Sequence, residues 1–370
     1  MRARAGDGRV RPGRLGGLLA AALALAGGGA PAVTSLVPPP GFTARVEEGG
    51  RKRDCPALPR PYTGELKFPS KYEGSDAARD DFNPKAYARY KAATAGITEM
   101  ERQVSAQTAA YLNGGSATAL RCALDGLAAW ARAGALERPT RDHTGKAVRK
   151  WALASFASAY VRLKFSQSRP LDAAPEQVHD IEPWLERLGR QVVDDWRDQP
   201  LEKINNHEYW AAWAVMATAV AVDRRDWFDW AVGQYRIAAG QVDRDGFLPN
   251  ELKRDTRALS YHNYALGPLA MIVAFARANG VDLRGENDGA LDRLARRVLA
   301  GVDDPRTFEA RTGSKQDLKE LREASKFAWL EPYCWLNRCE ARLSRRVIAL
   351  RPIKAYRLGG NLTELFAHPS

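Results

Sequence analysis

The chain has 370 residues, of which 45% are apolar and 27% are charged. These proportions are typical of a packed globular protein, and they exclude a fibrous or wholly disordered chain. The length allows one large domain or two smaller ones. The formal net charge of +12 favours an anionic partner without identifying it.

The first 32 residues have the organisation of a secretory signal peptide. Five arginines precede an apolar run over residues 15–26, and small residues follow as far as Ala32. The run is too short to span a bilayer. We therefore expect cleavage after about Ala32 and an exported protein without a membrane anchor. Cleavage would remove five Arg and one Asp, which lowers the formal charge from +12 to +8.

Four cysteines agree with export to an oxidising compartment. Cys55, Cys122, Cys334 and Cys339 lack the paired C-x-x-C spacing of a zinc site, which favours disulfides. The sequence permits three pairings. Because Cys334 and Cys339 can close a small loop, we expect that bond, together with a second bond from Cys55 to Cys122.

The rest of the chain, residues 33–370, is predicted to form a single helical domain. Residues 33–66 read as an extended N-terminal arm, and residues of about 67–84 as a polar loop that could act as a lid. From about Ala86 onward, helix-favouring residues dominate and alternating strands are absent from the pattern. The candidate helices cover residues 86–113, 117–134, 146–166, 181–198, 207–222, 226–242, 256–279 and 288–301.

Two kinds of helix indicate the architecture. Arg293, Arg296 and Arg297 fall at helical spacing, which is typical of a surface helix. Residues 210–222, in contrast, are apolar nearly all round, so that helix must be covered on most sides. An inner layer of apolar helices inside an amphipathic outer layer predicts an all-α protein, either an α/α toroid or a bundle. Periodicity does not choose between these two.

A first candidate site lies immediately before the apolar helix, in the segment NNHEYW at residues 205–210. An asparagine there can cap the helix. His207 would then lie in the first turn, where the positive helix end lowers the pKa of an imidazole and favours its neutral form. Helix capping without any catalytic role remains an alternative explanation of these residues.

A second candidate site lies at the start of the 256–279 helix. Arg257 and Tyr264 are seven residues apart, so we expect them on one helix face with Tyr261 between them. A guanidinium and a phenol suit an anionic sugar, although tyrosines at this spacing are also common in cores.

These segments resemble the signature segments of the periplasmic alginate lyases, polysaccharide lyase family five. The matching segments are KYEGSD (71–76), NNHEYW (205–210), GFLPNEL (246–252), RALSYHNYAL (257–266) and KFAWLEP (326–332). The resemblance runs from about Cys55 to Leu365. It implies an incomplete α/α toroid with a deep groove and mannuronate-preferring cleavage by β-elimination. It also implies a periplasmic place beside the alginate biosynthesis and export machinery.

The resemblance also implies which residues act. The family's catalytic set falls on Asn206, His207, Arg257 and Tyr264. Substrate contacts are expected at six further positions, of which the first is the lid lysine: Lys71, Tyr72, Arg254, Tyr209, Trp210 and Tyr261. We expect no metal and no other cofactor, because Asn206 and Arg257 can offset the negative charge that a cation would offset.

Two versions of the chemistry stay open. In the version that we favour, His207 takes the proton from carbon 5 of the uronate and Tyr264 protonates the leaving oxygen. In the other version Tyr264 performs both roles and His207 holds the carboxylate or polarises the tyrosine. That version is reasonable because the proton and the leaving oxygen of mannuronate lie on the same side of the ring, and because a neighbouring arginine lowers the pKa of a tyrosine.

Other functions share part of this pattern. A non-catalytic periplasmic alginate-binding or scaffold protein, or a lyase for another acidic polysaccharide, would have the same fold and charge. We expect an anionic polysaccharide as the partner, and contact with the export complex stays open. Nucleic acid is not expected, because no reading motif is present, and we expect a monomer.

Overall fold

The computed structural model describes residues 35–47, 49–50 and 54–366. The predicted signal peptide lies outside these residues. From Leu36 onward the chain forms one compact unit. Within the described residues the only strands are β1 (Lys354–Ala355) and β2 (Gly360–Asn361), which pair antiparallel. The described part of the chain therefore confirms the all-α prediction.

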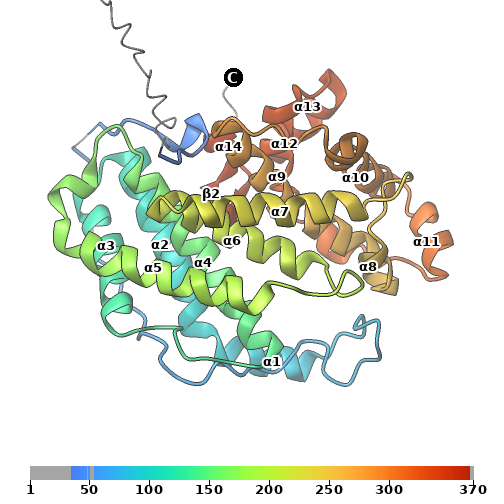
Figure 1. Cartoon of the computed structure of the whole chain (residues 1–370), viewed down its shortest axis with the longest axis horizontal. Coiled ribbons are helices and arrows are strands. Elements are labelled where there is room, and N and C mark those ends of the chain that lie inside the picture. Colours follow the sequence, from blue (N-terminus) through green and yellow to red (C-terminus); the bar gives the residue numbers. More distant parts are fainter. Residues whose placement is uncertain (1–34, 48, 51–53, 367–370) are drawn as a thin grey trace, which may run out of the picture. The chain divides into compact units, whose positions relative to one another are not determined.

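The helices follow one another with short connections (Figure 1). The longer ones, in chain order, are α1 (Pro84–Ala93), α2 (Ala95–Gly114), α3 (Ala117–Arg132), α4 (His143–Lys164), α5 (Pro175–Trp196), α6 (Asn206–Val222), α7 (Arg225–Gln241), α9 (Ala258–Ala278), α10 (Glu286–Asp303), α12 (Leu330–Asn337) and α13 (Ala341–Leu350). The shorter ones are α8 (Pro249–Leu252), α11 (Arg306–Thr312) and α14 (Leu362–Phe366).

Two predicted helix boundaries were wrong. The predicted helix 86–113 is two helices, because Thr94 ends α1 with a non-helical backbone and α2 starts directly after it. The predicted start at residue 181 was too late, since α5 begins at Pro175, a residue suited to the first turn, and continues through Pro183.

The apolar helix α6 occupies the centre of the packing. It contacts α4, α5, α7 and α9, and α5 and α7 lie on either side of it in Figure 1. Every residue from Glu208 to Ala221 is buried, as predicted for a helix that is apolar all round. Burying a large apolar side chain stabilises the fold by about 1.5–3 kcal/mol, so this helix is a rigid support for the residues at its N-terminus.

The segment of residues 67–83, which precedes α1, is an ordered turn rather than a helix. Its turn is closed by hydrogen bonds from the Glu73 amide to the Ser70 carbonyl and from the Ser75 amide to the Tyr72 carbonyl, both 3.0 Å long. Gly74 has a φ of +85°, a backbone conformation that favours glycine. At its other end the Asn83 side chain caps α1.

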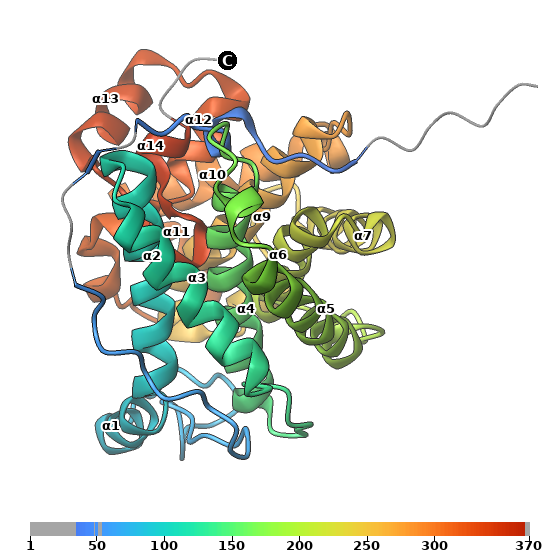
Figure 2. The same cartoon turned by 90° about the vertical axis from the view of Figure 1, so that its left-hand side faces the viewer.

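This segment approaches the N-terminus of α4, as Figure 2 shows. The carboxylate of Asp142, which caps α4 by accepting from the Gly145 amide at 2.6 Å, also accepts from the Phe68 amide at 3.3 Å. The two elements are thus joined through one carboxylate.

Two disulfides cross-link the domain. Cys55 is bonded to Cys122 of α3, and Cys334 to Cys339. Both bonds confirm the predicted pairing. None of the helices in the described part combines the length and the apolar character that a membrane-spanning helix requires.

Candidate active site

The N-terminus of α6 is organised by a capping box. The Asn205 side chain accepts a hydrogen bond from the His207 amide at 3.0 Å, and the Glu208 carboxylate accepts one from the Asn205 amide at 2.9 Å. Asn205 therefore performs the capping. The capping explanation accounts for that residue alone and leaves Asn206 and His207 for other roles.

Asn206 is held by a buried carboxylate. Its backbone amide donates to Oε1 of Glu251 at 2.6 Å, and its side-chain Nδ2 donates to Oε1 and Oε2 at 3.0 and 3.2 Å. Glu251 belongs to α8 and is fully buried. Burial raises the pKa of this carboxyl to about 7, and the hydrogen bonds from Asn206 oppose the rise. Glu251 thus fixes the orientation of the asparagine amide.

The ring of His207 lies among three other rings. Trp196 is stacked with it at a centroid distance of 5.5 Å and an interplanar angle of 3°. The ring of Trp151 is tilted against it at 5.9 Å, and the ring of His143 meets it edge-on at 4.6 Å. These contacts fix the plane of the imidazole.

A buried lysine lies behind His207. Nζ of Lys150, from α4, is 2.8 Å from Nδ1 of His207 and 2.9 Å from its carbonyl oxygen. The pKa of His207 is lowered well below its usual range, first by burial and then by Lys150 when that group is charged. The imidazole is therefore neutral at pH 7; the sequence predicted a lowered pKa from the positive helix end, whereas burial is the main cause in the structure.

Tyr264 projects from α9 and is stacked on Trp210 of α6 at a centroid distance of 5.0 Å. Burial raises the pKa of its phenol well above the usual range, and the charge of Arg357 opposes that rise. Arg357 is anchored in turn by Glu101, with two contacts of 3.0 and 3.1 Å, and its guanidinium lies 5.0 Å from the Trp151 ring. Trp151 thus contacts both His207 and the arginine beside Tyr264.

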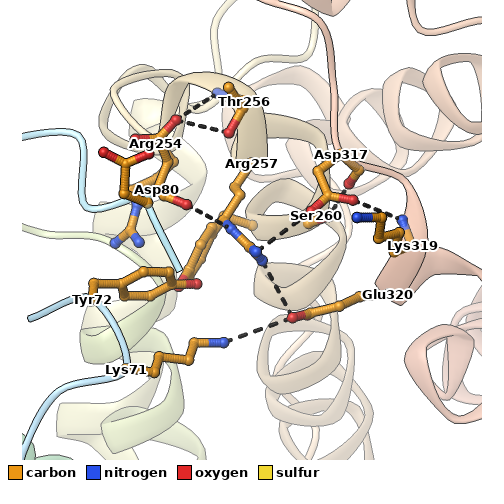
Figure 3. Close-up of polar contacts among 12 residues, drawn as sticks. Lys71, Tyr72, Asp80, Arg254, Thr256, Arg257, Ser260, Asp317, Lys319 and Glu320 are labelled. Carbon is orange, nitrogen blue, oxygen red and sulfur yellow. Dashed lines mark hydrogen bonds and ion pairs between the residues drawn. The ribbon is translucent and has the colours of Figure 1, made fainter. Parts of the chain in front are cut away.

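Arg257 contacts a different set of residues from Tyr264. It ends a short 3₁₀ turn, Asp255–Arg257, with a non-helical backbone, so the two residues do not share a continuous helix as their spacing predicted. Its guanidinium instead donates to the Asp80 carbonyl at 3.0 Å and pairs with Glu320 at 3.3 Å and Asp317 at 3.4 Å (Figure 3). Arg257 therefore joins the 67–83 segment to the residue 317–320 stretch.

The expected lid residues gather around the same arginine. The Tyr72 ring lies 5.1 Å from the Arg254 guanidinium and 5.5 Å from that of Arg257, and its hydroxyl accepts from the Tyr261 hydroxyl at 2.9 Å. Lys71 reaches Glu320 at 3.8 Å (Figure 3). We call these contacts the lid contacts. We call Asn206, His207, Trp210 and Tyr264 the His207 group. The lid contacts lie next to it, because the ring of Tyr261 meets that of Tyr264 at a centroid distance of 6.5 Å.

Tyr209 does not join either group. Its side chain is 1% exposed and its hydroxyl donates to Gln241 of α7 at 2.7 Å. The ring is therefore part of the core and is not available to stack on a sugar, which corrects the expected role. The other expected residues divide between the two groups: Asn206, His207, Trp210 and Tyr264 in one, and Lys71, Tyr72, Arg254, Arg257 and Tyr261 in the other.

Sequence reasoning missed several partners of these residues: Lys150, His143, Trp151, Trp196, Glu251, Arg357 and Glu320. Glu251 lay within a quoted signature segment but received no role. A pair of basic residues inside the apolar stretch of α4 was a usable signal for Lys150, since a charged residue on a buried face requires a partner.

The arrangement suits acid–base chemistry. A neutral imidazole can accept a proton, and a phenol with a raised pKa keeps its proton until it is needed. Titratable pairs whose pKa values are driven apart in this way are typical of general acid–base sites. Among the described residues no cluster of His, Cys, Asp or Glu is arranged to hold a metal ion.

Sequence comparisons identify the family. The sequence model of the family described as alginate lyase matches residues 67–308. An alginate lyase of Pseudomonas aeruginosa is 57% identical over 333 residues, which cover 90% of this chain and 91% of that protein. An alginate lyase of Azotobacter vinelandii is 55% identical over 344 residues, 92% of each chain.

Solved structures share the fold. Alginate lyase A1-III from Sphingomonas species A1 superposes with a TM-score of 0.72 and 24% identity, over 86% of this chain and 89% of that chain. A complex of A1-III with a tetrasaccharide gives a TM-score of 0.73 over 87% and 89%. An alginate lyase from Bacteroides ovatus gives 0.59 over 85% and 89%, at 15% identity. These likenesses confirm the predicted fold class, the α/α toroid.

Proposed function

The chain belongs to the alginate lyase family, and we propose that it cleaves mannuronate-rich alginate by β-elimination with His207 as the base and Tyr264 as the acid. The observation that carries this proposal is geometric: α6, which begins with Asn206 and His207, packs against α9, and Trp210 of α6 is stacked on Tyr264 of α9. The imidazole of His207 is neutral and the phenol of Tyr264 is protonated at pH 7.

The reaction begins at carbon 5 of the uronate, whose proton is made less acidic by the ionised carboxylate beside it. His207 takes this proton. The two contacts from Nδ2 of Asn206 to Glu251 share one amide hydrogen, and the second amide hydrogen is the donor for the substrate carboxylate as negative charge develops on it. Removing one such donor typically costs about 3–4 kcal/mol of transition-state stabilisation. The same bound uronate carries the leaving oxygen at carbon 4.

Tyr264 protonates that oxygen as the bond to carbon 4 breaks. The phenolate left behind lies beside Arg357, whose positive charge stabilises it. Because the proton and the leaving oxygen of mannuronate lie on the same side of the sugar ring, a base and an acid from adjoining helices suit this uronate. We therefore propose a preference for mannuronate over guluronate, with products that carry an unsaturated non-reducing end.

The lid contacts supply the polyanion-binding part of the proposal. Lys71, Arg254 and Arg257 place three cations beside the site, and repeating carboxylates of alginate would meet several of them at once. Binding should weaken with salt, as screening reduces each of these attractions. The complex of A1-III with a tetrasaccharide supports an oligosaccharide of this length as the bound species.

We also propose a periplasmic location, action as a monomer, and a role beside the alginate biosynthesis and export machinery. The support is the signal-like N-terminus and the two disulfides, which form in oxidising compartments. Fractionation of cells into periplasm and cytoplasm, with the protein detected by antibody, tests the location.

Absorbance of the unsaturated product tests the chemistry. We expect it to rise with polymannuronate and to rise little with polyguluronate; acetylated mannuronate is the third substrate. Tyr264→Phe is the matched control, since it removes only the hydroxyl and keeps the ring on Trp210. A flat trace together with intact polymer binding would indicate that the protein is a polysaccharide-binding scaffold protein and not an enzyme. Equal rates on both polymers would overturn the mannuronate preference.

A further inference from the structure

Lys150 has no part in the chemistry described so far, yet it touches the proposed base directly. Its side chain is 0% exposed. Nζ lies 2.8 Å from Nδ1 of His207, 2.9 Å from the His207 carbonyl oxygen and 3.7 Å from the centre of the Trp196 ring. A lysine placed so closely against an imidazole determines which ring nitrogen carries the hydrogen.

We propose that Lys150 is a neutral amine that accepts a hydrogen bond from Nδ1 of His207, leaves Nε2 unprotonated, and takes the Nδ1 proton during elimination. This inference rests on the proposed function, in which His207 is the base. Lys150 acts through His207 and does not touch the substrate, so it is a positioning and relay residue.

The hydrogens around Nζ can be counted. A neutral amine has two hydrogens and one lone pair. The His207 carbonyl can only accept, so it takes one hydrogen, and the face of Trp196 takes the other. The lone pair is then left for Nδ1–H. An ammonium group would instead donate to Nδ1, and the neutral ring would carry its hydrogen on Nε2, where it could accept no proton.

The neutral form is favoured by the surroundings of Lys150. Buried charges in proteins are normally paired, but the two carboxylates whose charges act on Lys150 are engaged elsewhere. Asp195 pairs with Lys146 at 3.4 Å and with Arg149 at 2.7 Å, and Glu208 caps α6. Burial accordingly lowers the pKa of Lys150 well below its usual range.

The step balances in protons and electrons. Nε2 of His207 takes the proton of carbon 5 while Nδ1 gives its own to Nζ. The electron pair of the broken C–H bond forms the double bond between carbons 4 and 5. The pair of the broken C–O bond leaves with the oxygen, which Tyr264 protonates. The proton stored on Lys150 then returns through His207 to the Tyr264 phenolate, and the site is restored.

The charge that Lys150 gains has a place to be stabilised. The Trp196 face lies against Nζ, and the negative face of an indole ring stabilises a desolvated cation. A pH profile will also sense the other groups that face this pair. For Lys150 these are Glu208, Asp195 and Arg357; for His207 they are His143, Arg254 and Arg79.

The ring tautomer can be measured without any assay of activity. The wild-type protein is labelled with ¹⁵N-histidine, and its five histidines are resolved by NMR, with His207→Gln to assign the signal. We expect the hydrogen on Nδ1 and a bare Nε2 at pH 8. A hydrogen on Nε2 would overturn the proposal. Because this spectrum does not depend on catalysis, it also separates a failure of the relay from a failure of the lyase function.

Two variants then test the relay. Lys150→Met keeps the packing on Trp196 but accepts no proton, so kcat should fall about 10²-fold with little change in KM. The acid limb of the pH profile of kcat/KM should also move. Lys150→Arg retains a positive charge that is never lost, and it should be at least as slow as the methionine variant. Rescue of the rate by arginine would overturn the proposal, since a permanent cation would then suffice.

Lys164→Met is the matched control. It removes a lysine from the same helix that pairs with Glu182 at 2.7 Å rather than with His207 or Asp195. Its rate should equal that of the wild type. Thermal unfolding of each variant separates a folding defect from a catalytic one, and a Lys150→Met protein that is folded and retains wild-type kcat would overturn the relay.

Discussion

The two groups of residues in the site differ in how they are held. The residues around His207 come from α4, α5, α6 and α9, and they are held by buried contacts: Lys150 is 0% exposed, Glu251 0% and Asn206 2%. The lid contacts come from the 67–83 segment, residues 254–261 and the 317–320 stretch, and their ion pairs join the buried guanidinium of Arg257 to carboxylates that are partly open to solvent. In the pair between Lys71 and Glu320 the side chains are 33% and 44% exposed.

This difference separates chemistry from binding. Hydrogen bonds and charges in the buried group are poorly screened, so each contact there affects pKa values and rates strongly. Exposed ion pairs contribute only about 0–1 kcal/mol and weaken in salt, which suits contacts that must exchange with a charged substrate. We therefore expect substitutions in the His207 group to lower kcat and substitutions in the lid contacts to change KM.

Tyr264→Phe should have the largest effect. It removes the proton donor and keeps the stack on Trp210, so kcat should fall about 10³-fold, within the usual range for a general acid. Circular dichroism should be unchanged. Steady-state absorbance kinetics on polymannuronate measure the effect, and a fall of less than tenfold would remove Tyr264 from the chemistry.

His207→Gln should lower kcat by about 10²-fold, the usual effect of losing a general base. Glutamine fills a similar volume among the surrounding rings but accepts no proton with useful affinity. Single-turnover kinetics isolate the chemical step. A variant that keeps more than a tenth of the wild-type rate would favour the other version, in which Tyr264 acts as both base and acid.

The sequence predicted the helix that supports the site better than it predicted the residues that contact the catalytic side chains. The apolar run of α6 and the asparagine before it define a covered helix with a capped N-terminus, because both signals are local. Lys150 meets His207 across 57 positions of sequence, so their contact depends on how α4 packs against α6. Periodicity does not contain that information.

Arg257 illustrates a second limit. Its spacing from Tyr264 is helical, but the helix starts only at Ala258, so the arginine turns toward Asp80 and Glu320 instead. Arg357, which lies beyond the last predicted helix, takes the place next to Tyr264. Spacing predicts a shared face only when one helix contains both residues.

Glu251→Gln should have an intermediate effect on rate and a measurable effect on stability. Glutamine replaces one oxygen that accepts from Asn206 by an amide group that donates. The loss of this acceptor should lower kcat about tenfold. The wild-type carboxyl has its pKa raised from 4.5 to about 7 in the folded state, so the folded protein binds this proton more tightly than the unfolded chain. The contribution of this carboxyl to the free energy of unfolding is therefore fully present below pH 4.5. It amounts to about 3 kcal/mol and is lost as the pH rises through 7.

In urea unfolding at pH 5 and pH 8, the glutamine variant should lose the part of the pH dependence that this carboxyl causes. An unchanged difference between the two pH values would show that the Glu251 carboxyl does not titrate in this range. Equal kcat values would remove its positioning role.

Glu320→Gln should have the smallest effect, and it probes the lid contacts alone. Glu320 pairs with Arg257 at 3.3 Å and with Lys71 at 3.8 Å, and it competes there with the carboxylates of the substrate. Neutralising it should lower KM by about 1.5- to 5-fold, as expected from removing an exposed ion pair, with kcat nearly unchanged. The gain should shrink as salt is added.

Glu323→Gln is the control for that variant, because Glu323 is exposed and pairs with Lys326 at 4.0 Å rather than with Arg257 or Lys71. If Glu320→Gln instead lowered kcat as much as His207→Gln, the lid contacts would be part of the chemistry and the division between the two groups would fail. If alanine at both Lys71 and Tyr72 left kcat and KM unchanged, the 67–83 segment would not act as a lid, because the side chains that it places against Glu320 and Arg257 would then have no effect on substrate.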